Sequence, residues 1–255
     1  MTVAPPGTIL QRLFLRERLR AVPPGRFVEI GVGTGGLSHE LLRLGWHGEG
    51  WDLSEEAVAR STATNAGAVD EGRYSVRRGD WLEEPGGKAD LVASSMVIEH
   101  LPDEREARYF ERCREVLSER GRAVVLVPAS PQHWGIEDEI AGHKRRYTRE
   151  GLTARLDEFG FDIEHIAGLT FPVSNVLLPI SNALVHRSEG HKRALTEEER
   201  TRQSGTRDVA FKTTFPRALG LVLNERTLYP LHLVQKAARR SERALVLYAE
   251  ATPRR

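Results

Sequence analysis

The sequence predicts a protein of the α/β class, with a doubly wound sheet whose strands are mostly parallel. Short, apolar, β-branched segments alternate with longer segments of helical periodicity between residues 26 and 166. Four glycines within six residues follow the first apolar segment. The chain has 255 residues, 40% of them hydrophobic, which is enough to bury one large core. These three observations together favour one α/β core over several small domains.

The composition excludes several classes of protein. The net charge of +1, with 29% charged residues, gives no global basic field of the kind that attracts phosphate backbones. The single cysteine, Cys113, excludes an intramolecular disulfide and a cysteine metal site, and a reducing compartment suits it. No apolar run approaches the roughly 18 residues of a membrane span. We therefore expect a cytoplasmic protein with no membrane span and no nucleic-acid partner.

The first element is an amphipathic helix over residues 9–22. Ile9, Leu10 and Phe14 fall on one helical face, and arginines occupy much of the rest. Pro23 and Pro24 end the segment before the first strand. The apolar face predicts a helix that packs on the sheet.

The central motif is an apolar strand, residues 26–30, that runs into a glycine-rich loop and a helix over residues 37–44. Such a loop brings backbone close to a ligand, and the helix directs its free N–H groups at it. Gly31, Gly33 and Gly36 match the dinucleotide fingerprint, with Asp52 about 20 residues further on. Glu29, however, puts an acid where a pyrophosphate would lie. A phosphate-free, cationic ligand suits that charge better.

Residues 29–35 (EIGVGTG) resemble the first motif of the class I S-adenosylmethionine-dependent methyltransferases, E/D-x-G-x-G-x-G. This resemblance implies a Rossmann-like, seven-stranded sheet whose last strand is antiparallel and lies between the fifth and sixth. It also implies S-adenosylmethionine as the cofactor. The cofactor contacts implied within the motif are Glu29, Gly31, Gly33, Thr34 and Gly35.

Further cofactor contacts are expected after the next three strands, at residues 48–52, 74–77 and 90–95. The resemblance implies that Asp52 accepts hydrogen bonds from the ribose hydroxyls and Asp80 from the adenine amino group, with Trp81 against the ring. Asp80 as an ordinary turn acid and Trp81 as a core residue remain open alternatives. The fourth strand should end beside the methyl group. The remaining expected contacts are Leu53, Ser95 and Met96.

The acceptor side of the site is expected at residues 99–100 and in the polar segment 130–147. Residues 142–147 resemble a Gly-His-x-Arg-Arg-Tyr stretch of small-molecule members of the family. His143 is the first candidate for a general base and His100 the second, although a histidine bonded to the backbone is an alternative for His143. We expect no metal site, since no metal-ligand motif is clustered in the sequence. The expected acceptor contacts are Glu99, Trp134 and Tyr147.

The predicted helix over residues 103–118 carries two acids and a cysteine whose roles can be predicted from their spacing. Asp103 and Glu106 form an Asp-x-x-Glu pattern at its start, which is typical of caps. Cys113 has the spacing of a core residue on this helix.

The domain organisation follows from the distance between the last two strands. After strands at 122–127 and 161–166, the closing strand is expected only at 243–250. Residues 171–242 are then a helical insertion, with a charged portion from 187 to 207. It is interpreted as a lid, a contact in a homo-oligomer, a helical decoration of the sheet edge or, for residues 228–243, a membrane-surface contact. Residues 1–24 form an N-terminal helical cap, and 25–170 with 243–255 form the core.

The predicted function is in-line transfer of the methyl group of S-adenosylmethionine to an oxygen, nitrogen or carbon atom of a small organic acceptor, without a metal. The cofactor is already reactive, so catalysis is mainly the positioning of two partners. An NAD(P)-dependent oxidoreductase and a non-catalytic cofactor-binding scaffold remain as alternatives. A comparison of S-adenosylmethionine binding with NAD binding distinguishes the methyltransferase from the oxidoreductase. Turnover of an acceptor distinguishes it from the non-catalytic scaffold.

Overall fold

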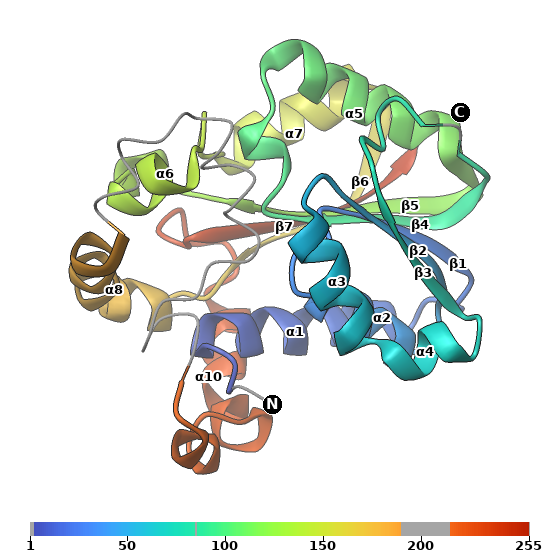
Figure 1. The fold of residues 1–255 in the computed structure, drawn as a ribbon. Helices are drawn as coiled ribbons and strands as arrows, with labels where there is room; N and C mark the ends of the chain where they lie inside the picture. Colours follow the sequence, from blue (N-terminus) through green and yellow to red (C-terminus); the bar gives the residue numbers. More distant parts are fainter. Residues whose placement is uncertain (1–2, 85, 190–214, 255) are drawn as a thin grey trace.

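The computed structural model describes residues 3–84, 86–189 and 215–254. Within these residues, seven strands form one sheet in the order β3-β2-β1-β4-β5-β7-β6 (Figure 1). Neighbours among the first five strands are parallel, whereas β7 runs antiparallel to both β5 and β6. The predicted fold class and strand arrangement are therefore confirmed. The strands are β1 (Arg26–Ile30), β2 (His47–Asp52), β3 (Tyr74–Arg78), β4 (Ala89–Ser95), β5 (Leu117–Pro128), β6 (Phe161–Leu169) and β7 (Val246–Pro253).

Several strand boundaries differ from the prediction, and the starts of β5 and β7 differ by more than one residue. β5 begins at Leu117, because Leu117 already pairs with Ala89 before an irregularity in the β4 and β5 register. β7 begins at Val246 instead of residue 243, because a turn that bonds the Ala244 N–H to the Ser241 carbonyl precedes it. A strand pairing sets the first position and a turn sets the second, and neither is visible in the apolar pattern.

Helices cover both faces of the sheet (Figure 1). α5 (Asp103–Val116) and α7 (Arg149–Glu158) pack on one face, and α1 (Pro6–Leu19) and α2 (Gly36–Arg43) pack on the other. Adjacent residues of β1 serve opposite cores, since Val28 joins the α5 side and Phe27 the α1 side. Cys113 is fully buried in the α5 core, as its spacing predicts. The other helices of the core are α3 (Glu55–Thr64), α4 (Ala66–Asp70) and α6 (Ile136–Ala141), with short 3-10 turns η1 (Ile98–His100) and η2 (Pro131–His133).

The predicted helical insertion between β6 and β7 is present. It contains α8 (Val173–Glu189), the 3-10 turn η4 (Arg217–Leu221) and α10 (Glu225–Ala237). α10 packs on α1, where Leu228 meets Ile9 and the Gln235 amide donates to the Leu10 carbonyl at 3.0 Å. Most of the predicted charged portion, residues 190–207, lies outside the described residues. Among the helices that the structure describes, none is long and apolar enough to cross a membrane.

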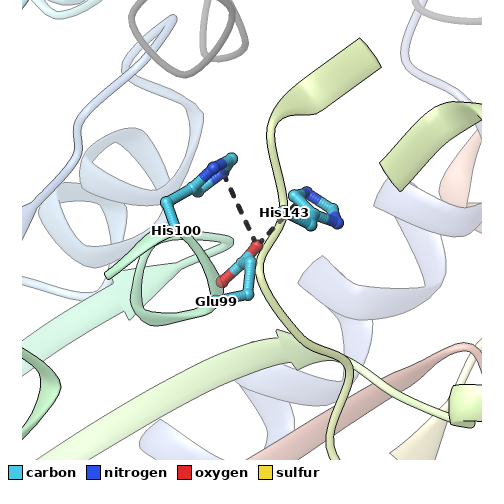
Figure 2. A group of neighbouring side chains, drawn as sticks. All are labelled: Glu99, His100 and His143. Carbon is cyan, nitrogen blue, oxygen red and sulfur yellow. Dashed lines mark ion pairs between the residues drawn. The ribbon is translucent and has the colours of Figure 1, made fainter. Parts of the chain in front are cut away.

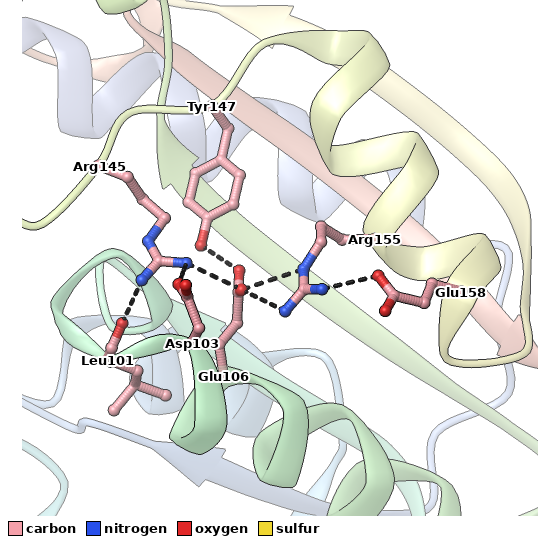
Figure 3. A network of polar contacts seen from close by, with 7 residues as sticks. All are labelled: Leu101, Asp103, Glu106, Arg145, Tyr147, Arg155 and Glu158. Atoms are coloured by element: carbon pink, nitrogen blue, oxygen red, sulfur yellow. Dashed lines mark hydrogen bonds and ion pairs between the residues drawn. The ribbon is translucent and has the colours of Figure 1, made fainter.

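Glu106 is not a helix cap, which corrects the sequence interpretation. α5 starts after Pro102 without a side-chain cap, and Glu106 is fully buried. Its carboxylate accepts hydrogen bonds from the Tyr147 hydroxyl at 2.6 Å and from Arg145 and Arg155 at 3.0 and 2.8 Å (Figure 3). These bonds join α5, α7 and the segment between α6 and α7, so Glu106 fixes the base of the loop that carries the acceptor side of the site.

Candidate active site

A cavity of about 1670 Å³ lies at the carboxyl ends of the central parallel strands. The loop after β1 and the ends of β2 and β4 form its floor, and α1 and α8 supply walls. Ligands of open parallel sheets bind at this edge, where the strand order reverses. The expected residues that line the cavity are Glu29, Gly31, Gly33, Thr34, Asp52, Leu53, Asp80, Trp81, Ser95, Met96, His100 and His143.

The glycine-rich loop turns sharply between β1 and α2. Gly31, Gly33 and Gly35 all have positive φ, at 73°, 50° and 79°. Gly35 precedes the first turn of α2, and a Cβ there would lie 2.8 Å from the Cα of Ser61 on α3. Gly35 is therefore required for packing, and it does not line the cavity as the sequence led us to expect.

Glu29 is a buried acid at the end of β1. It is 1% exposed, and its carboxylate accepts a hydrogen bond from the Ser38 hydroxyl, which also contacts the Tyr74 hydroxyl at 2.6 Å. Burial raises the pKa of Glu29 to about 8, and the nearby Asp52 carboxylate acts in the same direction. Glu29 consequently holds its proton at neutral pH until a cation approaches it.

Asp52 ends β2 beside this loop. One carboxylate oxygen accepts from the Gly33 N–H at 3.1 Å and the other from the Ser54 N–H at 2.9 Å. These bonds fix the carboxylate at the cavity wall with acceptor capacity left over. Leu53, the next residue, is 58% exposed and lies at the rim.

Asp80 and Trp81 lie next to each other on the cavity wall. Asp80 forms an ion pair with Arg105 and accepts from the Leu82 N–H at 3.1 Å. Trp81 is 3% exposed and packs against Tyr109, as a core residue does. It also lines part of the cavity. Asp80 therefore makes the contact of a turn acid and lines the cavity as well.

Met96 holds an unusual backbone conformation at the end of β4. Its φ of 58° lies in the left-handed region, which is rare for residues other than glycine. Its N–H donates to the Leu126 carbonyl at 2.8 Å, which fixes the turn. Met96 and Ser95 both line the cavity.

Glu99, His100 and His143 converge on the other side of the cavity (Figure 2). Glu99 and His100 belong to η1, whereas His143 follows Gly142, the residue that ends α6. Nε2 of His143 lies 3.7 Å and Nε2 of His100 lies 4.0 Å from the same Glu99 oxygen. Burial raises the pKa of Glu99 to about 8. The Glu99 carboxylate lies behind the two rings and is itself outside the cavity lining.

Asp138 is the residue that sequence reasoning missed. It is fully buried, and one of its oxygens lies 2.8 Å from Nδ1 of His143 and accepts from Nε of Arg146 at 2.7 Å. Burial opposes ionisation, but the bonds from His143 and Arg146 outweigh it and lower the pKa of Asp138 to about 2. The sequence places it in the polar segment 130–147, five residues before His143, and nothing in that pattern marks its pairing with a histidine.

Two expected acceptor contacts are corrected by the structure. Trp134 is 44% exposed at the end of η2 and is not among the residues that line the cavity. Tyr147 pairs with Ala129 through its backbone, which turns its side chain to Glu106 and away from the cavity. Local sequence placed both residues in the right loop but could not give the direction of their side chains.

Comparison with known proteins agrees with this arrangement of glycine loop, strand-end acids and cavity. The family model described as a methyltransferase domain matches residues 7–166. The chain belongs to this family. Its methyltransferase domain is 29% identical over 154 residues to the phenazine-1-carboxylate N-methyltransferase of Pseudomonas aeruginosa. That match covers 56% of this chain and 46% of the relative, so the chain spans less than half of the relative's length.

Solved structures share the fold of this methyltransferase domain. Magnesium protoporphyrin IX methyltransferase from Synechocystis PCC 6803, with bound S-adenosylhomocysteine, gives a TM-score of 0.55 at 19% identity, over 64% of this chain and 77% of that one. Phosphoethanolamine N-methyltransferase 2 from Haemonchus contortus, in complex with S-adenosyl-L-methionine, gives a TM-score of 0.59 at 18% identity. This match covers 96% of this chain and 52% of that one. At these identities the likeness establishes the fold alone.

Proposed function

We propose that this methyltransferase domain transfers the methyl group of S-adenosylmethionine to an oxygen, nitrogen or carbon atom of a small organic acceptor. The observation that carries the proposal is one cavity with two chemically different sides. The strand-end acids Glu29, Asp52 and Asp80 border one side, and the histidines His100 and His143 border the other. A volume of about 1670 Å³ exceeds the roughly 300–1,000 Å³ typical of a single ligand pocket, which suits a cofactor and an acceptor together.

The cofactor is assigned to the side of Glu29, Asp52 and Asp80. Asp52 accepts from the ribose hydroxyls, Asp80 from the adenine amino group, and the buried Glu29 faces the ammonium group of the methionine part. The backbone of the glycine loop approaches the cofactor closely, and Trp81 borders the adenine. No metal is needed to hold the cofactor in this arrangement, because Glu29 pairs with its ammonium group and Asp52 and Asp80 accept hydrogen bonds from its ribose and adenine.

The reaction is an in-line displacement at the sulfonium methyl group. A lone pair of the acceptor forms the new bond to the methyl carbon, and the electron pair of the carbon–sulfur bond stays on sulfur to give S-adenosylhomocysteine. The acceptor proton, where there is one, leaves to a base. His143 suits this role, since it lines the cavity and its Nδ1 is held by Asp138 at 2.8 Å, which leaves Nε2 as the nitrogen that accepts a proton. His100 is the alternative base.

The helical insertion is assigned as a lid over the acceptor. Leu177, Leu178 and Leu184 of α8 line the cavity, and the Ser181 hydroxyl donates to Glu137 of α6 at 2.5 Å. Other apolar side chains of the insertion, such as Val176 and Leu221, are 73% and 84% exposed, which favours a homo-oligomer contact as a second role. The low net charge supports a small acceptor over a nucleic acid, and the unpaired, buried Cys113 supports a cytoplasmic protein.

Calorimetric titration tests the cofactor assignment directly. We expect S-adenosylmethionine and S-adenosylhomocysteine to bind one molecule per chain in the presence of EDTA, and NAD and NADP to give no heat. Binding of NAD without S-adenosylmethionine would move the protein to the oxidoreductase class. Binding of S-adenosylmethionine with no labelled methyl transfer to any member of a broad acceptor library would favour the non-catalytic alternative.

A further inference from the structure

We propose that Glu99, His100 and His143 bind a divalent transition-metal ion, with Zn²⁺ as the best match, at the acceptor end of the cavity. Each residue offers one ligand atom, and the three atoms lie within 4.8 Å of one another (Figure 2). Two imidazoles and one carboxylate are a donor set that Zn²⁺ uses where one coordination position stays open. The sequence predicted no metal site, because the three residues come from two separate segments.

The hydrogen bonds of the two histidines set the orientation of their lone pairs. Nδ1 of His143 faces the ionised Asp138 carboxylate at 2.8 Å, and Nδ1 of His100 faces the Gly142 carbonyl at 3.3 Å. Both partners are acceptors, so each Nδ1 carries the hydrogen and each neutral ring keeps its lone pair on Nε2. Both Nε2 atoms are directed at the same Glu99 oxygen, at 3.7 and 4.0 Å. Once a cation displaces the proton of Glu99, three acceptors meet at one point, an arrangement that the cation completes.

The Glu99 carboxylate is the second observation. The side chain is fully buried, and neither oxygen has a hydrogen-bond partner among the described residues. Buried carboxylates are normally paired or bound to a metal, because burying an unsatisfied charge costs several kcal/mol. Its two nearest ionisable neighbours are the histidines, at distances too long for hydrogen bonds. A metal ion between these atoms satisfies all three groups at once.

The residues behind the ligands also match a metal centre. Histidine ligands usually donate their second N–H to a carboxylate or a carbonyl, and here Asp138 and Gly142 take these two roles. Asp138 is held in turn by Arg146 at 2.7 Å and by the Gly135 N–H at 2.9 Å. Arg146 balances the charge of Asp138, and a divalent cation gains a charged carboxylate ligand when it displaces the proton of Glu99.

The spacing is close to that of a tetrahedral centre. Bonds of roughly 2.0–2.2 Å to Zn²⁺ separate neighbouring ligand atoms by about 3.3–3.6 Å. The His143 and Glu99 pair, at 3.7 Å, needs to close by only tenths of an ångström. Both histidines line the cavity, so the fourth position opens towards it. This step rests on the proposed function: the fourth position receives an oxygen or nitrogen atom of the acceptor and so orients it towards the methyl group. With the ion bound, Nε2 of His143 is a ligand and not the base, so the acceptor proton leaves to water.

Titration of the metal alone tests the site. The full chain is freed of metal with a chelator, dialysed, and titrated with Zn²⁺ by calorimetry and with Co²⁺ by visible absorption. We expect one ion per chain with a dissociation constant of about 1 μM or tighter, and a Co²⁺ spectrum of four-coordinate type. Glu99→Gln and His143→Ala should each weaken binding by at least about 100-fold. Asp138→Asn, which removes the charge that supports the His143 ring and pairs with Arg146, should weaken it by about 10–100-fold.

His47→Ala is the matched control, because His47 is an exposed histidine at the start of β2 and lies outside the cavity lining. It should leave zinc binding unchanged. Circular dichroism melts show whether each variant folds, and His100→Ala replaces Glu99→Gln if the latter does not. Wild-type binding weaker than about 100 μM, or binding that survives Glu99→Gln and His143→Ala in folded protein, overturns the site.

The result is independent of the proposed function, because S-adenosylmethionine is titrated separately. Cofactor binding without zinc binding overturns the metal site alone. Zinc binding that needs Glu99 and His143, with no cofactor binding, supports the metal site and removes the methyltransferase proposal.

Discussion

Replacing Glu29 by glutamine should stabilise the protein, and the gain should grow with pH. Burial raises the pKa of Glu29 from 4.5 to about 8. Between these two pH values the unfolded chain has lost the proton of Glu29 while the folded protein keeps it, so the folded state loses stability as pH rises. The full difference corresponds to about 5 kcal/mol at pH 8 and above, as an upper limit. Below pH 4.5 Glu29 carries a proton in both states and contributes nothing.

Glutamine keeps the shape of the side chain and an oxygen that accepts from the Ser38 hydroxyl, but it has no charge to bury. Urea unfolding of wild type and Glu29→Gln at pH 5, 6.5 and 8 measures the effect. The variant should exceed wild type by less than about 1 kcal/mol at pH 5 and by several kcal/mol at pH 8. Other buried acids, Glu99 among them, titrate in both proteins and cancel in the difference. A difference that is independent of pH, or one that shrinks as pH rises, refutes the reasoning.

The same substitution tests what Glu29 is for. If the cofactor ammonium group lies against Glu29, binding should ionise it, and below pH 8 one proton should be released to the buffer. Calorimetry of S-adenosylmethionine binding in buffers of different ionisation enthalpy counts this proton. We expect release of up to one proton at pH 7 in wild type and none attributable to this site in Glu29→Gln. Equal release in both proteins would place the ammonium group elsewhere.

Three further substitutions test other parts of the site. Asp52→Ala should weaken cofactor binding by ~1–3 kcal/mol, because the ribose hydroxyls lose their hydrogen-bond acceptor. An unchanged dissociation constant refutes that assignment. His143→Ala should lower the methyl-transfer rate by ~10²-fold or more at unchanged cofactor affinity, and His100→Ala in parallel shows which histidine matters more. Glu106→Gln should lower the free energy of unfolding by ~1–3 kcal/mol, because Tyr147 and two arginines lose a charged acceptor. Chemical denaturation measures this free energy. A stability equal to that of wild type contradicts the role of Glu106.

The sheet was predictable because its signals are local. Strands buried on both faces are continuous apolar runs, and helices between them carry a 3.6-residue period. Phe27 and Val28 illustrate this, since adjacent residues of β1 enter opposite cores. The errors lie where a tertiary contact overrides a local pattern. Glu106 has the spacing of a cap but is buried, where it accepts hydrogen bonds from Tyr147 and two arginines. The bond to Glu106 directs the Tyr147 side chain away from the cavity.

The two sides of the cavity differ in how far they can be predicted, and the reason is the distance along the chain. On the cofactor side, Glu29 and the glycine loop are adjacent in sequence, and Asp52 and Asp80 each follow a strand, so a short motif and strand ends locate them. On the acceptor side, Glu99 meets His143 because the Lys144 N–H donates to the Glu99 carbonyl at 2.8 Å and Asp138 orients the histidine ring. No spacing in the sequence encodes these two steps. A shared fold and cofactor motif therefore leave the acceptor open, and its chemistry has to be derived from the non-local cluster itself.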